Sequence, residues 1–342
     1  MTALGVLWFV LVAVLIIGYF ALDGFDLGCG VLYPFVARTE RERAQVRRAV
    51  GPVWDGNEVW LLTAGGALFA AFAPAYATSF SGFYLAIMLV LFGLILRAAA
   101  LEFRAHETGA LARFWDVMFF VGSLLPALLF GVAVGNVLKG VELNAAGDYT
   151  GGFFALLNPF ALLCGVLGLV HMLLLGASWL ALKAPEDDLR QRALRLRRVF
   201  ALVDLAVFAL ASLLFFVQVV PASAAGVTAN LVSCLFALVF VAATAGVASM
   251  RGYDRRANLR AHVLTSLGCV GLVGAVAASL FPNLIPATDP HFSITIANAA
   301  STDTSLAAMT IIACIGVPLV LVYHVIAYRI FNGELSDADL TY

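Results

Sequence analysis

The stretch from residue 61 to residue 96 contains no charged side chain. A transmembrane helix needs only about 20 apolar residues, so this run is too long for one span. Pro74 and the Ser-, Thr- and Gly-rich segment at 78–82 are expected to form a turn that divides it in two. Of the 342 residues, 63% are hydrophobic and only 12% are charged, which leaves too little charge for a water-facing surface. The chain is therefore predicted to be an integral membrane protein.

Further apolar runs of spanning length predict an all-α, polytopic protein with about nine transmembrane helices in a single domain, 1–342. The first run has no Lys or Arg before Arg38 and no polar cleavage region, so we expect a retained span and not a signal peptide. The expected helices lie near 4–33, 52–73, 79–102, 115–137, 157–182, 199–220, 227–250, 261–282 and 305–331.

The basic residues predict the orientation of these helices. Of the 20 Lys and Arg residues, all but Arg97 and Lys139 fall in alternate connections or at the C-terminal end. Cytoplasmic loops are the ones enriched in Lys and Arg. The N-terminus is therefore expected outside and the C-terminus in the cytoplasm.

Five ionisable residues interrupt the first three predicted helices: Asp23, Asp26, Asp55, Glu58 and Arg97. A charge at mid-membrane costs at least about 2.5 kcal/mol, so each needs a partner, water or a function. Given the orientation, all five are expected to converge in the cytoplasmic half of the membrane, as a proton entry route requires. Interfacial ion pairs or helix-end caps are the alternative, since Asp55 and Glu58 lie at the positive end of their helix.

Other polar residues in the predicted spans indicate less. Asp116 and Asp204 lie near expected cytoplasmic helix ends and are interpreted as boundary residues. His171 and His324 could each ligate haem, but no second axial ligand is identifiable by spacing, so they are interpreted as packing residues. The five cysteines form no CxxC pair and indicate neither a disulfide framework nor a metal site.

Several motifs resemble subunit II of cytochrome bd-type quinol oxidases. The similarity is specific up to about residue 182 and looser beyond. The motifs are DGFDLG at 23–28, GPVWDGNEVWLLTAGGALFAAFAP at 51–74, FSGFY at 80–84, GVAVGNVLKG at 131–140, GGFFALLNPF at 151–160 and PLVLVYHVIAYRIF at 318–331.

The resemblance implies a respiratory complex that oxidises quinol and reduces oxygen to water, electrogenically but without pumping protons. It implies a pseudo-symmetric heterodimer in which subunit I carries b-type haem, and d-type haem in many members, together with the quinol-oxidation site. This chain has no evident set of haem ligands, and it is expected to have no catalytic residue and no activity on its own; whether a haem contacts it is left open. A small single-helix subunit and a structural quinone within this chain are left open, as is the choice between ubiquinol and menaquinol. The expected location is the cytoplasmic membrane of a bacterium or archaeon.

The resemblance also implies roles for individual residues. It assigns Asp55 to a cytoplasmic proton pathway, and it links Trp54, Asp26 and Arg97 to the integrity of the haem region. Roles for Glu58 and Asp23 in the pathway are inferred from their positions and not from the family.

Two other functions remain as alternatives. A proton-coupled secondary transporter would also have carboxylates within its spans, although here they are concentrated in the first three helices. A purely structural partner would have no part in proton transfer.

Overall fold

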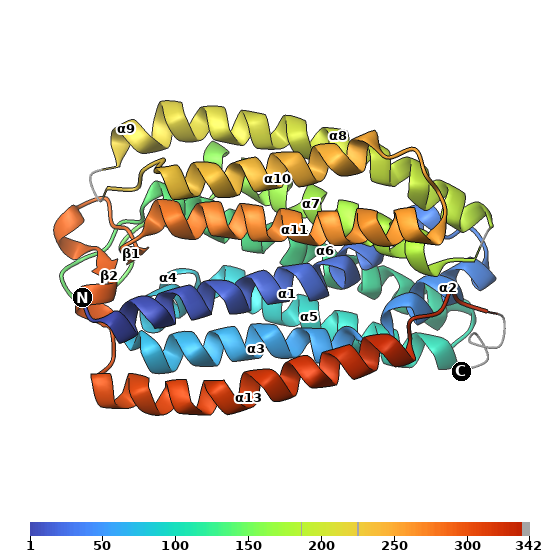
Figure 1. Ribbon diagram of the computed structural model, residues 1–342, viewed down its shortest axis with the longest axis horizontal. Coiled ribbons are helices and arrows are strands. Elements are labelled where there is room, and N and C mark those ends of the chain that lie inside the picture. Colours follow the sequence, from blue (N-terminus) through green and yellow to red (C-terminus); the bar gives the residue numbers. More distant parts are fainter. Residues whose placement is uncertain (186, 224–225, 337–342) are drawn as a thin grey trace.

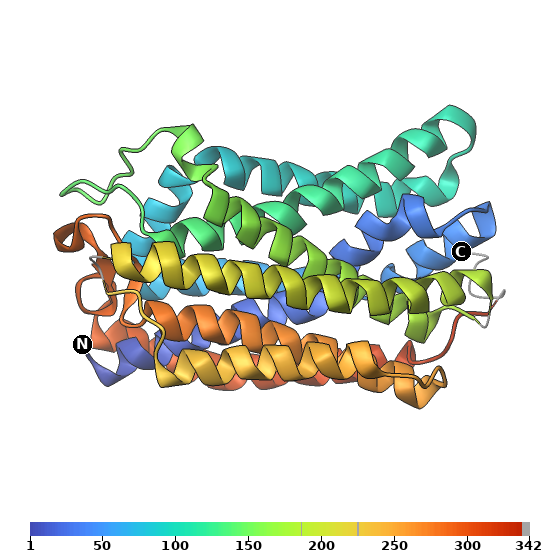
Figure 2. The same cartoon turned by 90° about the horizontal axis from the view of Figure 1, so that it is seen from above.

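A computed structural model describes residues 1–185, 187–223 and 226–336. The chain forms an elongated bundle whose long helices run roughly parallel to its longest axis (Figures 1 and 2). The long helices are α1 (Ala3–Val36), α3 (Trp54–Ala71), α5 (Tyr84–Phe103), α6 (Gly109–Lys139), α7 (Pro159–Lys183), α8 (Asp188–Leu214), α10 (Leu231–Ser249), α11 (Arg255–Leu280) and α13 (Asp303–Ile330).

Shorter elements join the long helices. They are α2 (Glu40–Val50), α4 (Ala73–Gly82), α9 (Val220–Ala222), α12 (Ile296–Ala299), 3-10 turns at Arg104–His106, Phe153–Leu156 and Pro290–Phe292, and a π-helical turn at Phe215–Val219. Strands β1 (Asn283–Ile285) and β2 (Ile294–Thr295) form a small antiparallel pair at the end of the bundle that holds the N-terminus (Figure 1).

Eight of the described helices are long and apolar enough to cross a membrane, whereas nine were expected. The remaining expected span corresponds to α3. This helix has 18 residues, a length of about 27 Å, and carries Asp55, Asn57 and Glu58 in its first two turns. It still lies beside α1 and α13 in the bundle (Figure 1). The count of nine spans therefore remains a prediction that depends on α3.

The uncharged run at 61–96 divides differently from the prediction. The helix breaks at Phe72 and again at Phe83, and the expected turn at 78–82 is part of helix α4. Pro74 lies in the first turn of α4, where its missing N–H leaves no helical hydrogen bond unmade. Proline here begins a short helix instead of a loop.

Helix α1 forms the centre of the bundle, where it contacts α3, α6, α7 and α11. Every residue in the run Asp23–Tyr33 is buried. A Cβ placed on Gly28 would lie 1.8 Å from the Met172 carbonyl oxygen. A Cβ placed on Gly176 would likewise clash with the backbone of Gly28. Paired glycines thus bring the α1 and α7 backbones into contact.

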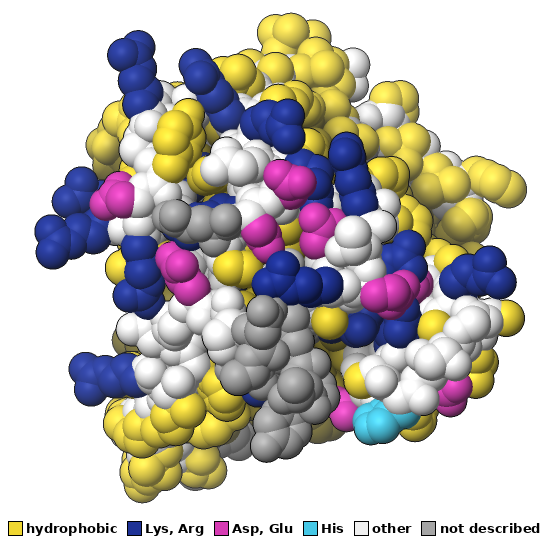
Figure 3. All heavy atoms as spheres, turned by 90° about the vertical axis from the view of Figure 1, so that its right-hand side faces the viewer, with side chains coloured by type: hydrophobic (Ala, Val, Ile, Leu, Met, Phe, Trp, Pro, Cys, Tyr) yellow, Lys and Arg dark blue, Asp and Glu magenta, His cyan; other side chains and the backbone are white. Residues whose placement is uncertain are grey.

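Lys and Arg side chains spread over the end of the bundle where α1 ends and the described chain ends (Figure 3). At this end Asp116 pairs with Arg43 at 3.0 Å and with Arg104 at 2.6 Å, and Tyr33 donates a hydrogen bond to it. The positive-inside rule assigns this end to the cytoplasm. The orientation itself remains a prediction.

Candidate functional site

A buried charge cluster lies where α1, α3 and α5 meet. Arg97 is fully buried, and its Nη2 lies 2.8 Å from Asp23 Oδ1. The same nitrogen forms an ion pair with Glu58, whose side chain is 23% exposed. One guanidinium thus joins a completely buried carboxylate to one that reaches the surface of the chain.

Asp26 lies in the same region but is held by an amide. Asn57 Nδ2 donates to Asp26 Oδ2 at 2.7 Å and to the Leu22 carbonyl at 3.3 Å. Asn57 Oδ1 in turn accepts a hydrogen bond from the Tyr328 hydroxyl at 2.9 Å. The hydrogen bonds therefore link three helices, α1, α3 and α13, at Asp26.

Several buried polar atoms of this cluster have no hydrogen-bond partner among the described residues. They are Asp26 Oδ1 and the Nε and Nη1 atoms of Arg97, whereas Asp23 Oδ1 is ion-paired with Arg97 Nη2. Three carboxyl groups face one guanidinium, and an unpaired buried carboxylate is costly. The cluster can therefore hold and exchange protons.

The structure brings together four of the five predicted residues and separates the fifth. Asp55 lies in the first turn of α3 with its side chain exposed, and it is not hydrogen-bonded to the cluster in the described chain. Asp55 lies on the same face of α3 as the exposed residues Leu62 and Phe69, at spacings of seven residues. Its neighbour Trp54 is half-buried. Glu58, one turn further along α3, lies between Asp55 and the buried charges.

Sequence reasoning missed Asn57 and Tyr328. An amide in an apolar helix needs a partner when buried, so Asn57 could have been identified as a polar position requiring one. Tyr328 had no such signal, because 271 residues separate it from Asn57 along the chain.

The interpretation of Asp204 as a boundary residue was wrong. Helix α8 begins at Asp188 and not near 199, so Asp204 lies more than four turns inside it and is fully buried. It lies 2.8 Å from His171 Nδ1, and His171 Nε2 lies 3.2 Å from the Thr265 carbonyl oxygen.

Neither predicted intramembrane histidine offers a nitrogen to haem iron. Both ring nitrogens of His171 are engaged, as described above. His324 Nε2 accepts from the Trp60 indole at 3.2 Å, and its Nδ1 lies 2.9 Å from the Val320 carbonyl oxygen. No group of three or more His, Cys, Asp or Glu side chains within the described ranges is placed to hold a metal ion. These residues do not fit a haem site.

Comparisons with known proteins identify the family of the chain. The family described as cytochrome bd terminal oxidase subunit II matches residues 4–331. Cytochrome bd-I ubiquinol oxidase subunit 2 of Escherichia coli is 35% identical, with 98% of this chain and 96% of the relative covered. Cytochrome bd ubiquinol oxidase subunit 2 of Bacillus subtilis is 32% identical over the whole of both chains.

A solved structure supports the fold. A chain of the bd oxidase from Geobacillus thermodenitrificans superimposes with a TM-score of 0.74 at 19% identity, covering 96% of this chain and 99% of that one.

Proposed function

This chain belongs to the cytochrome bd terminal oxidase subunit II family, and from that premise we propose that it delivers protons from the cytoplasm toward the oxygen-reducing haem of a partner subunit. Proteins of this family are subunits of a quinol oxidase complex of the respiratory chain, which contains haem, in bacterial membranes. The family match gives no support to the secondary transporter. The location we propose is the cytoplasmic membrane, with the Arg-rich end inside.

The observation that carries the proposal is the graded exposure of three carboxyl groups. Asp55 is exposed, Glu58 is 23% exposed and paired with Arg97, and Asp23 is completely buried against the same guanidinium. A proton taken up at Asp55 would pass to Glu58 and then into the buried cluster. Arg97 keeps its charge throughout and offsets the carboxylate that loses a proton.

The haems would lie in the partner, subunit I; the two predicted intramembrane histidines of this chain, His171 and His324, do not fit a haem site. The surface proposed for that partner is the stripe on α3 that contains Asp55, Leu62 and Phe69. A carboxylate facing lipid at membrane depth would be costly, whereas one covered by a protein partner can be hydrated or paired. Protons leaving the cluster would cross this surface to reach the haem, where the reduction of oxygen to water consumes them.

Oxygen uptake by the purified complex with quinol as donor tests the proposal. Asp55→Asn removes the proton-carrying group while keeping the shape of the side chain. Asp303→Asn is the matched control, since Asp303 is an exposed acid in the first turn of α13, at the other end of the bundle. We expect Asp55→Asn to retain the full haem spectrum and to turn over at least tenfold more slowly, a typical effect of losing a proton-transfer group. Full haem with unchanged turnover would contradict a role for Asp55.

A further inference from the structure

Helix α13 lies at the edge of the bundle, with most of its surface uncovered by the rest of this chain (Figure 1). Ile312, Ile315 and Leu319 are each more than 60% exposed. Near the charge cluster, however, α13 directs two polar side chains inward. His324 accepts from Trp60, and Tyr328 donates to Asn57.

The contact from Tyr328 reinforces the orientation of the Asn57 amide that the Leu22 carbonyl and Asp26 also favour. An amide has an accepting oxygen and a donating nitrogen, and a hydroxyl that donates to the oxygen directs the nitrogen away. In this structure the nitrogen faces the Asp26 carboxylate at 2.7 Å. With Asp26 Oδ2 engaged in this way, Asp26 Oδ1 is the carboxyl oxygen left for proton exchange.

The residues after α13 fix the end of the helix that carries Tyr328. We call residues 331–335 the strap. The Lys183 ammonium donates to the Phe331 carbonyl and, at 3.2 Å, to the Gly333 carbonyl. The Leu335 N–H donates to the Lys183 carbonyl at 2.9 Å, and Arg190 pairs with Glu334 at 3.2 Å. The strap therefore ties the end of α13 to α7 and α8.

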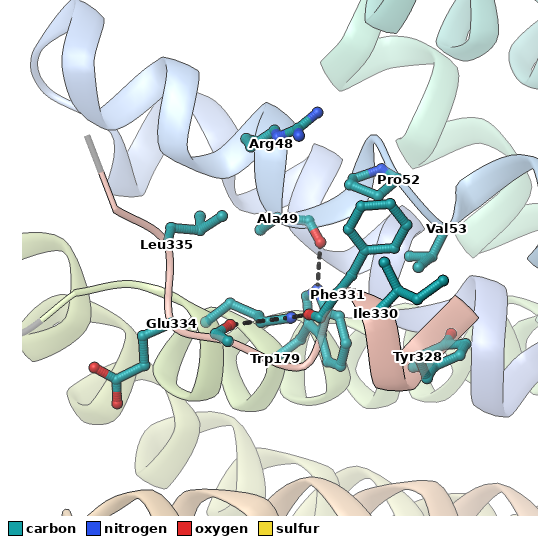
Figure 4. Close-up of a pocket in the computed structure, with 12 residues that line it drawn as sticks. Arg48, Ala49, Pro52, Val53, Trp179, Tyr328, Ile330, Phe331, Glu334 and Leu335 are labelled. Atoms are coloured by element: carbon teal, nitrogen blue, oxygen red, sulfur yellow. Dashed lines mark hydrogen bonds between the residues drawn. The ribbon is translucent and has the colours of Figure 1, made fainter. Parts of the chain in front are cut away.

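A cavity of about 150 Å³ lies between the strap and the α2–α3 connection (Figure 4). Tyr328 and Trp179 line it on the side of the bundle, Phe331 belongs to the strap, and Pro52 and Val53 line it on the side of α3. Close packing is thus incomplete just below Tyr328. The Tyr328 ring contacts Trp179 and His324, and its hydroxyl is held by the hydrogen bond to Asn57.

We propose that Tyr328 is a positioning residue for proton transfer at Asp26, acting through the Asn57 amide. This inference rests on the proposed role of the cluster in proton delivery. The role of Tyr328 can be tested separately from the proposed route, because Tyr328 lies on α13. It is neither the exposed carboxylate Asp55 nor part of the Glu58–Arg97–Asp23 ion-pair chain.

Tyr328→Phe in the whole purified complex removes the hydroxyl and keeps the ring. Tyr323→Phe is the matched control, since Tyr323 is on the same helix, 53% exposed, and makes no side-chain hydrogen bond within the described chain. We expect Tyr328→Phe to keep the haem spectrum and to lower quinol-dependent oxygen uptake about fivefold, the factor that corresponds to one net hydrogen bond. Tyr323→Phe should retain the wild-type rate.

Two further measurements separate positioning from a general loss of structure. Redox-difference infrared spectra should contain a carboxyl C=O band that Asp26→Asn abolishes and Tyr328→Phe shifts. In addition, Asn57→Leu combined with Tyr328→Phe should be no slower than Asn57→Leu alone, because Tyr328 acts through Asn57. An unshifted band, multiplicative rate losses, or equal rates for the two tyrosine variants would each overturn the proposal.

The outcome also distinguishes this inference from the proposed route. If Tyr328→Phe is slow and Asp55→Asn is not, Asp26 is positioned as proposed but protons enter elsewhere. If Asp55→Asn is slow and Tyr328→Phe matches Tyr323→Phe, the entry route is supported and the role of Tyr328 is refuted.

Discussion

The buried pair between His171 and Asp204 allows a quantitative prediction about stability. His171 Nδ1 lies 2.8 Å from an Asp204 carboxylate oxygen, and its Nε2 lies 3.2 Å from the Thr265 carbonyl oxygen. We interpret this contact as an ion pair: with Asp204 ionised, both oxygens are acceptors, and the ring satisfies both contacts as the doubly protonated imidazolium. The pair ties α7 to α8 and α11.

Removal of one partner should be far more damaging than removal of both. His171→Leu leaves the Asp204 carboxylate buried without a counter-charge, and Asp204→Leu leaves the imidazolium in the same situation. At 2.8 Å and an effective dielectric constant of about 20, the lost attraction is about 6 kcal/mol. Measured losses for broken buried pairs are about 3–5 kcal/mol. Replacement of both by leucine should leave stability within about 1 kcal/mol of wild type or above it, since Phe240 already packs against the ring.

The assay is denaturant-induced unfolding of the purified complex, for wild type, the two single variants and the double variant. We expect each single variant to unfold at a clearly lower denaturant concentration and the double variant to recover most of the difference. Oxygen uptake per haem should be unchanged in the double variant, because the pair is separate from the cluster on α1, α3 and α5. The ion-pair interpretation would be refuted if the single variants were as stable as wild type. It would also be refuted if the loss of stability in the double variant equalled the sum of the losses in the two single variants.

Two further predictions concern the α1–α7 contact and helix α2. Gly28→Ala should prevent assembly of the complex, because the added Cβ would lie 1.8 Å from the Met172 carbonyl oxygen. Gly168→Ala is the control and should assemble normally, because no atom from another helix lies closer than 3.5 Å to its Cβ. The yield of haem-containing complex measures both outcomes. Burial opposes ionisation of Glu42, but hydrogen bonds from the Arg38 N–H and the Arg192 guanidinium lower its pKa below the ordinary value. The stabilising effect of ionised Glu42 should be complete above its unfolded-state pKa and be lost as the pH falls through its folded-state pKa. Glu42→Gln should therefore reduce the change in thermal unfolding temperature with pH between these two pKa values.

The sequence was most informative where the physical constraint is local or where its cost is large. The expense of charge in lipid was enough to predict that Asp23, Arg97 and Glu58 would meet, and the structure places them in one ion-pair cluster. Helix-face spacing alone did not show that Asp55 would point outward while Asn57, two residues later, points inward. That choice depends on where α1 and α13 pack against α3.

The errors came from long-range contacts and from helix ends. The partnership of Tyr328 with Asn57 spans almost the whole chain, so no window of sequence contains it. The start of α8 was predicted too late because residues 188–198 are rich in arginine and resemble a loop by hydropathy. In the structure they continue the helix beyond the apolar run, with Arg190 and Arg197 buried. Asp204 thereby moved from an expected boundary to the interior of the bundle.

The two buried charge groups of this chain differ in their charge balance, and this difference indicates what each can do. His171 and Asp204 have one charge of each sign, so any change of protonation leaves an uncompensated charge and is opposed. The cluster on α1, α3 and α5 has three carboxyl groups for one guanidinium, so protons can be gained and lost while Arg97 still has an anionic partner. We therefore expect that the balanced pair can be replaced by leucines without functional loss, whereas making the unbalanced cluster apolar should remove its capacity to exchange protons. For this reason we propose proton transfer for the cluster on α1, α3 and α5, and helix association for the His171–Asp204 pair.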